Sequence, residues 1–273
     1  MRAWFYPQDG ETMAEAVNRE VLAARTTAGL LDASTLGKID IRGPDATEFL
    51  NRVYTNGWSK LAIGRCRYGL MLKDDGMVMD DGVTTRLNKN HYHMTTTTGG
   101  AAYVLDWLEE WLQTEWPDLQ VYLTSVTEQW AVATLSGPSA NKILQDAGID
   151  IDLSPTSFPF MSMQNCHIGG LPARVFRISF TGELYYEINV AARHGLAMWT
   201  HLMKSGAAHD ITPYGTEAMH VLRAEKGFII VGQETDGSVT PLDLGMDWIV
   251  SKAKPDFIGK RALARSTICL LYT

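Results

Sequence analysis

The sequence contains little cysteine and no long apolar run. Its 273 residues include three cysteines, Cys66, Cys166 and Cys269, which lie far apart and form no CxxC pair. This spacing excludes a disulfide-stapled mini-protein and a zinc-finger signature, and it is typical of reduced, cytoplasmic thiols. No segment approaches the ~20 apolar residues of a membrane span, and residues 1–21 lack the apolar core of a signal peptide. We therefore expect a cytoplasmic protein without a membrane partner.

Positive charge is also scarce. Lysine and arginine number 24 against 31 aspartates and glutamates, which gives a net charge of −7. A general nucleic-acid binder needs a basic surface, so no nucleic-acid partner is expected. The motifs HExxH, GxGxxG, GxxxxGK[ST] and GxSxG are all absent. Their absence argues against a metal site and against a self-contained flavin or nicotinamide dehydrogenase.

The patterning that is present favours an α+β fold with mostly antiparallel sheets. Two hairpins are predicted, one joining strands 67–72 and 78–87 around a DDG turn, the other joining strands 172–180 and 185–190 around TGE. Because the strands come in hairpin pairs between helices, an antiparallel arrangement is favoured over a parallel one. Further strands are predicted at 38–42, 91–98 and 131–135, and helices at 11–28, a short segment from Pro44, 101–114, 139–147, 194–205 and 213–226.

A strand–Gly-Pro–helix unit occurs twice. IRGPDATEFL at 41–50 aligns without gaps with LSGPSANKIL at 135–144. We interpret this as a weak internal duplication, although Gly-Pro turns are common enough for a chance match. The predicted division is a first subdomain at 1–150 and a second at 151–273. The Pro- and Ser-rich segment 148–165 is either the connection between them or a surface loop.

Two adjacent aspartates, Asp80 and Asp81, follow an apolar run at the start of a predicted strand. Adjacent strand side chains point to opposite faces, so one carboxylate can point inward while the other faces water. An inward carboxylate among apolar neighbours has a raised pKa and can act as an acid or base near neutral pH. The alternative is a pair of turn or cap aspartates.

Glu187 and Arg223 are the other candidates for binding chemistry. Glu187 lies in LYYEI, among aromatic and aliphatic residues, where a carboxylate needs a partner. A ligand with two parallel N–H donors suits it, because a carboxylate accepts two hydrogen bonds side by side. Arg223 lies on a predicted helix with an apolar face and is a candidate anion contact. The alternatives are a solvent-facing strand glutamate and a surface arginine.

Four segments of the chain, taken together, are specific: residues 28–56, 68–87, 179–188 and 222–246. In this order they resemble the folate-binding aminomethyltransferase family typified by the glycine-cleavage T-protein. Within that family, the opening residues and the run HYHMTTTTGG at 91–100 are most similar to the C-terminal folate-binding module of sarcosine oxidase alpha subunits. The resemblance covers nearly the whole chain.

The resemblance implies a function. It implies a duplicated α+β fold that binds tetrahydrofolate and converts a sarcosine-derived imine or formaldehyde equivalent to 5,10-methylenetetrahydrofolate. Other sarcosine oxidase subunits or domains are the implied partners, and flavin and NAD are expected only on those other parts. The alternatives are a free-standing aminomethyltransferase or demethylase of the same family, or an inactive folate-binding or assembly fragment.

The resemblance also implies site residues. The family has a tyrosine and an aspartate thirteen positions apart that face the folate, and Tyr68 and Asp81 have this spacing. Asp81 is the implied catalytic base, and Tyr68, Glu187 and Arg223 are the implied folate-binding residues. One departure is Phe180, which stands where the family has a tyrosine and therefore lacks its hydroxyl.

The C-terminal end departs from the family as well. After DFIGKRAL the sequence does not resemble the family's small C-terminal β-barrel, which is expected to be missing. We expect its absence to expose apolar residues within 241–273 and so to favour self-association or docking to another subunit. The candidates are Trp248, Ile249, Val250, Phe257 and Ile258.

Overall fold

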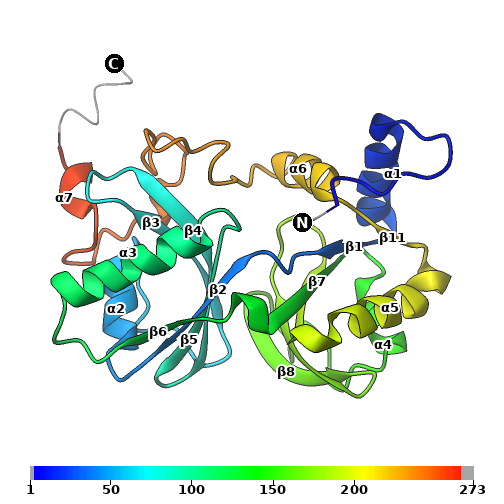
Figure 1. The fold of residues 1–273 in the computed structure, drawn as a ribbon, viewed down its shortest axis with the longest axis horizontal. Coiled ribbons are helices and arrows are strands. Elements are labelled where there is room, and N and C mark those ends of the chain that lie inside the picture. The colour runs from blue at the N-terminus through cyan, green and yellow to red at the C-terminus, as the bar shows by residue number, and fades with distance from the viewer. Residues whose placement is uncertain (1–2, 266–273) are drawn as a thin grey trace. The chain divides into compact units, whose positions relative to one another are not determined.

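A computed structural model describes residues 3–265 of the chain (Figure 1). The chain forms two compact units, each built from two separate stretches of sequence. Unit 1 comprises the chain up to Thr35 together with Thr127–Phe228, and unit 2 comprises Leu36–Val126 together with the chain from Ile229 onward.

Unit 1 is built on a six-stranded sheet with the order β11-β1-β7-β10-β9-β8. All neighbours are antiparallel except β1 and β11, which are parallel. The strands are β1 (Ala28–Asp32), β7 (Trp130–Ser136), β8 (Ser162–Ile168), β9 (Leu171–Arg177), β10 (Tyr185–Ala191) and β11 (Ile211–Pro213).

Helices cover both faces of this sheet. Leu30 packs in a cluster with α4 and α5, whereas Leu31 packs with α1 and α6. Adjacent strand residues point to opposite faces, so the two helix pairs lie on opposite sides of β1. The helical elements are α1 (Met13–Thr26), α4 (Ala140–Asp146), α5 (Gly195–Gly206) and α6 (Thr216–Ala224), with short 3-10 turns η1 (Thr127–Gln129), η2 (Ala192–His194) and η3 (Ala207–His209).

Unit 2 contains a five-stranded antiparallel sheet with the order β3-β4-β5-β2-β6. Its helices α2 and α3 pack on one face through a cluster that includes Phe49, Leu108 and Met94. The elements are β2 (Gly37–Arg42), α2 (Ala46–Val53), β3 (Cys66–Leu72), β4 (Val78–Asn88), β5 (His91–Thr96), α3 (Ala101–Thr114), β6 (Tyr122–Ser125), the 3-10 turn η4 (Asp247–Ile249) and α7 (Lys260–Leu263).

The predicted fold class is confirmed. The sheets are mostly antiparallel and helices pack on them, and neither sheet closes into a barrel within residues 3–265. In that same range, no helix is long and apolar enough to cross a membrane. Cys66 and Cys166 are buried in different units, and Cys269 lies outside the described residues.

The repeated strand–Gly-Pro–helix unit adopts the same backbone in both places. Gly43 and Gly137 follow β2 and β7 with φ values of +135° and +119°. A side chain at Gly43 would place its Cβ 2.0 Å from the Gln120 carbonyl oxygen, and one at Gly137 would lie 2.6 Å from the Thr27 carbonyl oxygen. Glycine is therefore required twice, for conformation and for close backbone approach. The two copies lie in different units.

The compact units do not follow the predicted division at residue 150. β1 pairs with β7 in register, Gly29 opposite Ser136, so the start of the chain joins the second copy of the duplicated unit. Residue 150 consequently falls inside unit 1. The segment 148–165 connects no two subdomains, and its last residues already belong to β8.

The first helix ends earlier than predicted. α1 stops at Thr26, and β1 begins at Ala28, inside the segment predicted to be helical. Gly29 packs so closely on Tyr214 that an added Cβ would lie 2.7 Å from the ring. This tertiary contact, together with pairing to two strands, outweighs the helical spacing of the segment.

Within residues 241–265, the part of this segment that the structure describes, the expected apolar patch is largely absent. Ile249, Phe257 and Ile258 are buried, and Val250 is partly buried. Ile249 and Phe257 join Leu70, Leu72 and Met246 in a core cluster beneath β3 and β4. Of the five candidates only Trp248 is exposed, at 70%. The expectation of a large exposed surface is therefore wrong for these residues.

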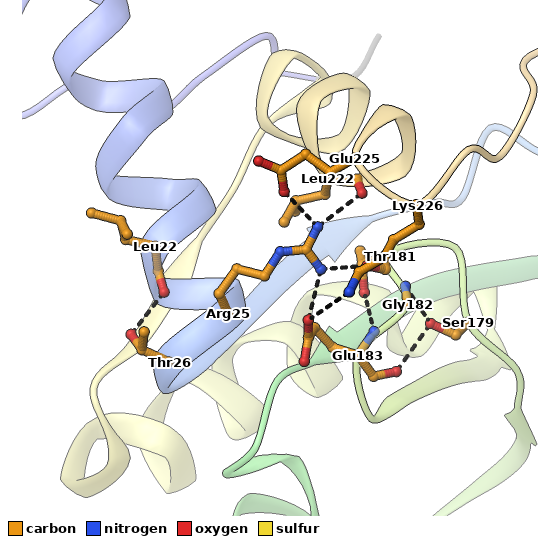
Figure 2. Close-up of polar contacts among 10 residues, drawn as sticks. All are labelled: Leu22, Arg25, Thr26, Ser179, Thr181, Gly182, Glu183, Leu222, Glu225 and Lys226. Atoms are coloured by element: carbon orange, nitrogen blue, oxygen red, sulfur yellow. Dashed lines mark hydrogen bonds and ion pairs between the residues drawn. The ribbon is translucent and has the colours of Figure 1, made fainter.

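Arg25 links three segments of unit 1 (Figure 2). Its guanidinium donates to the Thr181 carbonyl and to the Glu183 carboxylate, at 2.5 and 2.7 Å. It also donates to the Leu222 carbonyl and the Glu225 carboxylate at the end of α6, at 2.9 and 2.8 Å. Arg25 thereby ties α1 to α6 and to the turn that precedes β10.

We expect Arg25→Met to lower the free energy of unfolding by about 2 kcal/mol, the scale of a few charge-assisted hydrogen bonds lost together. The Arg25 side chain is only 17% exposed, so water replaces these bonds poorly. The matched control is Arg261→Met, since the Arg261 side chain is 89% exposed and pairs with Asp256. Thermal unfolding midpoints measure both. Equal small shifts would show that the Arg25 contacts contribute no more than a surface ion pair.

Candidate functional site

Asp80 and Asp81 lie on β4 and point to opposite faces of the unit 2 sheet. Thr84, on the face of Asp80, bonds Tyr54 of the helix-covered core at 2.9 Å. Asp81 shares the other face with Val83, whose cross-strand partner is Tyr68. The predicted opposition of the two carboxylates follows from strand geometry. The alternative of turn or cap aspartates is wrong, because both residues lie within the strand.

Asp80 is a buried carboxylate whose hydrogen bonds come from its own unit. It is 1% exposed. Its Oδ2 accepts the Thr97 hydroxyl at 2.9 Å, and its Oδ1 accepts the backbone N–H groups of Asp81 and Thr97 at 2.7 and 3.3 Å. Burial raises its pKa above the ordinary value, and the three donors oppose that shift. These contacts give Asp80 a structural role at the segment that leads into α3. One of the two carboxylates was expected to face water, and Asp80 does not.

Asp81 is paired with Tyr68. The Tyr68 hydroxyl donates to Asp81 Oδ2 at 2.6 Å. Both residues are partly buried. Desolvation raises the pKa of Asp81 to about 7, against the lowering effect of the Tyr68 hydrogen bond. Burial and the neighbouring carboxylate raise the pKa of Tyr68, so the phenol stays a donor. Asp81 is therefore a carboxylate that takes up and releases a proton near neutral pH.

This pKa predicts a pH-dependent stability. A carboxyl with a folded pKa of about 7 and an unfolded pKa near 4 binds more protons when folded. Its stabilising contribution is present below pH ~4 and is lost as pH rises to ~7. Asp81→Asn keeps an acceptor for Tyr68 and does not titrate. We expect its free energy of unfolding to rise relative to that of wild type by about 3–4 kcal/mol between pH 4 and 8, at roughly 1.4 kcal/mol per unit of pKa difference.

Unfolding midpoints measured across this pH range test the prediction. The exposed turn variant Asp74→Asn is the control, and its difference from wild type should not change over the same range. A constant difference for Asp81→Asn as well would contradict the raised pKa.

Glu187 lies on β10 in unit 1 and is 5% exposed. Tyr186 and Ile188 pack in the cluster with α4 and α5, so Glu187 points to the opposite face of the sheet. There its cross-strand neighbours are Thr134 and Phe176. Asn189, two residues on, donates through Nδ2 to Glu187 Oε1 at 3.1 Å. The interpretation of Glu187 as a solvent-facing strand residue is therefore wrong.

Polar atoms near Glu187 are buried without hydrogen-bond partners. Among the residues that the structure describes, Asn189 Oδ1 and Ser136 Oγ have none. Asn189 is 1% exposed and Ser136 is fully buried. Ser136, on β7, lies opposite Tyr185 of β10. Ser136 is therefore a diagonal neighbour of Glu187 on the same face of the sheet. Buried polar atoms are nearly always hydrogen-bonded, so this face has capacity for a ligand with donors.

Arg223 lies in the last turn of α6 and is 6% exposed, so it is not a surface arginine. Its Nη1 donates to the Phe228 carbonyl at 3.0 Å. The Phe228 ring stacks on Phe180, with centroids 6.1 Å apart. Phe180, the position where a tyrosine was expected, therefore contributes an aromatic face next to β10. α6 packs on the same side of the sheet as Glu187, through Leu31.

Comparison with known proteins identifies the family. The family described as the GCVT N-terminal domain matches residues 1–254. The chain belongs to this family. The resemblance inferred from the sequence is thereby confirmed.

The relatives of the chain carry two names. The chain is 59% identical over 265 residues to the sarcosine oxidase subunit alpha of Corynebacterium sp. strain U-96, covering 97% of this chain and 27% of that protein. It is 34% identical over 255 residues to the aminomethyltransferase of Symbiobacterium thermophilum, covering 92% of this chain and 67% of that one. The chain thus spans 27% of the length of its sarcosine oxidase relative.

A solved structure shows the same fold as this chain. The glycine cleavage system aminomethyltransferase T from Bartonella henselae matches with a TM-score of 0.82 at 26% identity. The match covers 96% of this chain and 67% of that one.

The predicted site residues of the chain lie in two groups. Tyr68 and Asp81 are in direct contact in unit 2, while Glu187 and Arg223 lie on one side of the sheet in unit 1. Sequence reasoning missed Asn189, although its place two residues after Glu187 on a predicted strand puts both on one face. Within residues 3–265, no three His, Cys, Asp or Glu side chains gather in a way that could hold a metal ion.

Proposed function

We propose that this chain binds tetrahydrofolate and transfers a one-carbon unit to it, as the folate-dependent part of a sarcosine-oxidase-like enzyme. The substrate is a sarcosine-derived imine or formaldehyde equivalent, and the product is 5,10-methylenetetrahydrofolate. The observation that carries the proposal is the Tyr68–Asp81 pair, a carboxylate with a pKa of about 7 held by a phenol at 2.6 Å. The 59% identity to a sarcosine oxidase subunit alpha, against 34% to an aminomethyltransferase, supports this donor over others.

Asp81 acts as the general base in this proposal. Tetrahydrofolate, when bound, supplies the nucleophilic nitrogen. The nitrogen loses a proton when it attacks the one-carbon unit. The Tyr68 hydroxyl occupies Asp81 Oδ2, so we assign the acceptance of this proton to Asp81 Oδ1. Because the Asp81 pKa lies near the pH of the reaction, the carboxylate is both present in quantity and basic enough to take the proton. The Tyr68 hydrogen bond fixes the orientation of the carboxylate, which is the positioning that efficient proton transfer needs.

The residues of unit 1 fit a pterin. Glu187 provides a buried carboxylate, which matches the amino group and ring N–H of a pterin as two parallel donors. The unpartnered Asn189 Oδ1 and Ser136 Oγ are further hydrogen-bonding atoms on this face. Arg223, a buried cation, is assigned to the folate as well. In this proposal these residues of unit 1 hold and orient the pterin.

Amine oxidation belongs to other parts of the enzyme in this proposal. The chain spans 27% of the length of its sarcosine oxidase relative, and flavin and NAD are assigned to the remainder and to other subunits. The partners are accordingly a small-molecule folate and the other subunits or domains, and the compartment is the cytoplasm.

Titration calorimetry of the purified chain with tetrahydrofolate tests the proposal. We expect saturable binding at one site. The control ligand is p-aminobenzoylglutamate, which has the folate tail without the pterin and should bind far more weakly, because Glu187 has no donors to receive from it. No heat of binding with tetrahydrofolate, from a chain that unfolds cooperatively, would overturn the proposed function. Equal affinity for both ligands would overturn the assignment of the pterin to Glu187.

A further inference from the structure

Asn189 makes one hydrogen bond in a defined direction. It follows Glu187 by two residues on β10, and both side chains point away from the cluster beneath α4 and α5. The contact of 3.1 Å joins Asn189 Nδ2 to Glu187 Oε1. A carboxylate accepts hydrogen bonds and does not donate, so the Asn189 amide must turn its nitrogen to Glu187. Its oxygen is then fixed as an acceptor beside the carboxylate.

This acceptor has no partner among the described residues, although Asn189 is only 1% exposed. Its cross-strand neighbours explain why. Val132 on β7 is apolar, and Arg174 on β9 directs its guanidinium over the Trp130 ring, 4.7 Å from the centroid. A buried, unsatisfied carbonyl oxygen destabilises the folded chain unless something donates to it.

We propose that Asn189 recognises the exocyclic amino group of the pterin by accepting a hydrogen bond from it, an inference that rests on the proposed function. The pterin edge that Glu187 faces carries three N–H bonds, one on the ring nitrogen and two on the amino group. The carboxylate takes one from each nitrogen. The second amino N–H points to the side of the carboxylate and is accepted by Asn189 Oδ1. Asn189 also fixes Glu187 through Nδ2, so it is both a specificity residue and a positioning residue.

The arrangement predicts discrimination between ligands. Glu187 and Asn189 together offer acceptors for three donors on adjacent nitrogens. A ring that lacks the amino group leaves Asn189 Oδ1 without a donor. A ring with an oxo group in place of the amino group brings two acceptors, the oxo oxygen and Asn189 Oδ1, into repulsive contact. A site built to bond a polar group rejects analogues without it strongly, because its buried partner is left unpaired. The ligand class is therefore the 2-amino-4-oxo pterins rather than dioxo pteridines.

A two-ligand cycle tests this assignment. Affinities of wild type and Asn189→Ala are measured by calorimetry for tetrahydrofolate and for its 2-desamino-2-methyl analogue. We expect Asn189→Ala to weaken tetrahydrofolate binding about 10-fold or more. The fold-loss of affinity for the analogue should be at least about 5 times smaller, since only tetrahydrofolate carries the amino donor. The control is Asn18→Ala, an exposed position on α1, which should change neither affinity.

The outcomes separate the inference from the proposed function. If wild type binds no tetrahydrofolate, both are overturned. If wild type binds tetrahydrofolate but Asn189→Ala loses affinity equally for both ligands, or for neither, only the role of Asn189 is overturned. Asn189→Ser is measured in parallel, because its small polar side chain fits the site and is too short to reach both partners. Unfolding midpoints close to wild type in at least one variant exclude a loss through misfolding.

Discussion

Replacing Asp81 by asparagine is expected to lower the rate of one-carbon transfer by ~10²–10⁴-fold, the scale of general acid–base catalysis. Tetrahydrofolate affinity should stay within a few-fold of wild type, because the asparagine keeps an oxygen for the Tyr68 hydroxyl and preserves the shape of the site. The amide cannot accept the proton that a carboxylate with a pKa of about 7 accepts. The loss therefore falls on the chemical step.

The assay offers formaldehyde directly to the chain with tetrahydrofolate, or sarcosine in the presence of the oxidase partners, and subtracts the rate without protein. In wild type the rate should rise with pH through about 7 as Asp81 loses its proton, and this rise should vanish in Asp81→Asn. The matched control is Asp80→Asn. Asp80 faces the helix-covered side and is held by Thr97, so the substitution should reduce the rate much less. A larger loss of rate in Asp80→Asn than in Asp81→Asn would contradict the assignment of Asp81 as the general base.

The Tyr68–Asp81 pair was within reach of sequence reasoning because it is local. The two residues lie on either side of one hairpin, and the register places Tyr68 opposite Val83, two residues beyond Asp81 on the same face. The family resemblance named the two residues as a pair, and the register of the hairpin explains why their side chains are in contact. The fold class and the helix at 101–114 were equally accessible, since each depends on the periodicity of one continuous segment.

The features that were missed depend on distant pairing. β1 was not predicted. It begins at Ala28, the last residue of the predicted helix, and it forms because β7 and β11 pair with it from more than 100 residues away. For the same reason a single division at residue 150 did not describe the units. The burial of Ile249 and Phe257 depends on contacts with Leu70 and Leu72 of β3. Apolar character alone shows that such residues need a partner, without showing that the partner lies within the same chain.

Replacing Glu187 by glutamine is expected to weaken tetrahydrofolate binding by ~10- to 100-fold, more than the ~1 kcal/mol of a typical neutral hydrogen bond. The substitution conserves size and strand geometry, so the change is electrostatic. Glutamine can still accept from Asn189 through its oxygen, but its second position is then an NH₂ group. That group faces a pterin edge made of donors, which replaces an attractive charge-assisted contact by a repulsive one.

Calorimetry of both proteins with tetrahydrofolate measures the effect, and Glu128→Gln provides the matched control. Glu128 is an exposed glutamate in the same unit, so removing its charge tests whether net charge alone alters folate binding. Its affinity should equal that of wild type. Unfolding midpoints of both variants are measured in parallel, so that weaker binding by a folded protein is distinguished from a loss of fold. Unchanged affinity would mean that the Glu187 carboxylate serves the packing of β10 and does not receive the pterin.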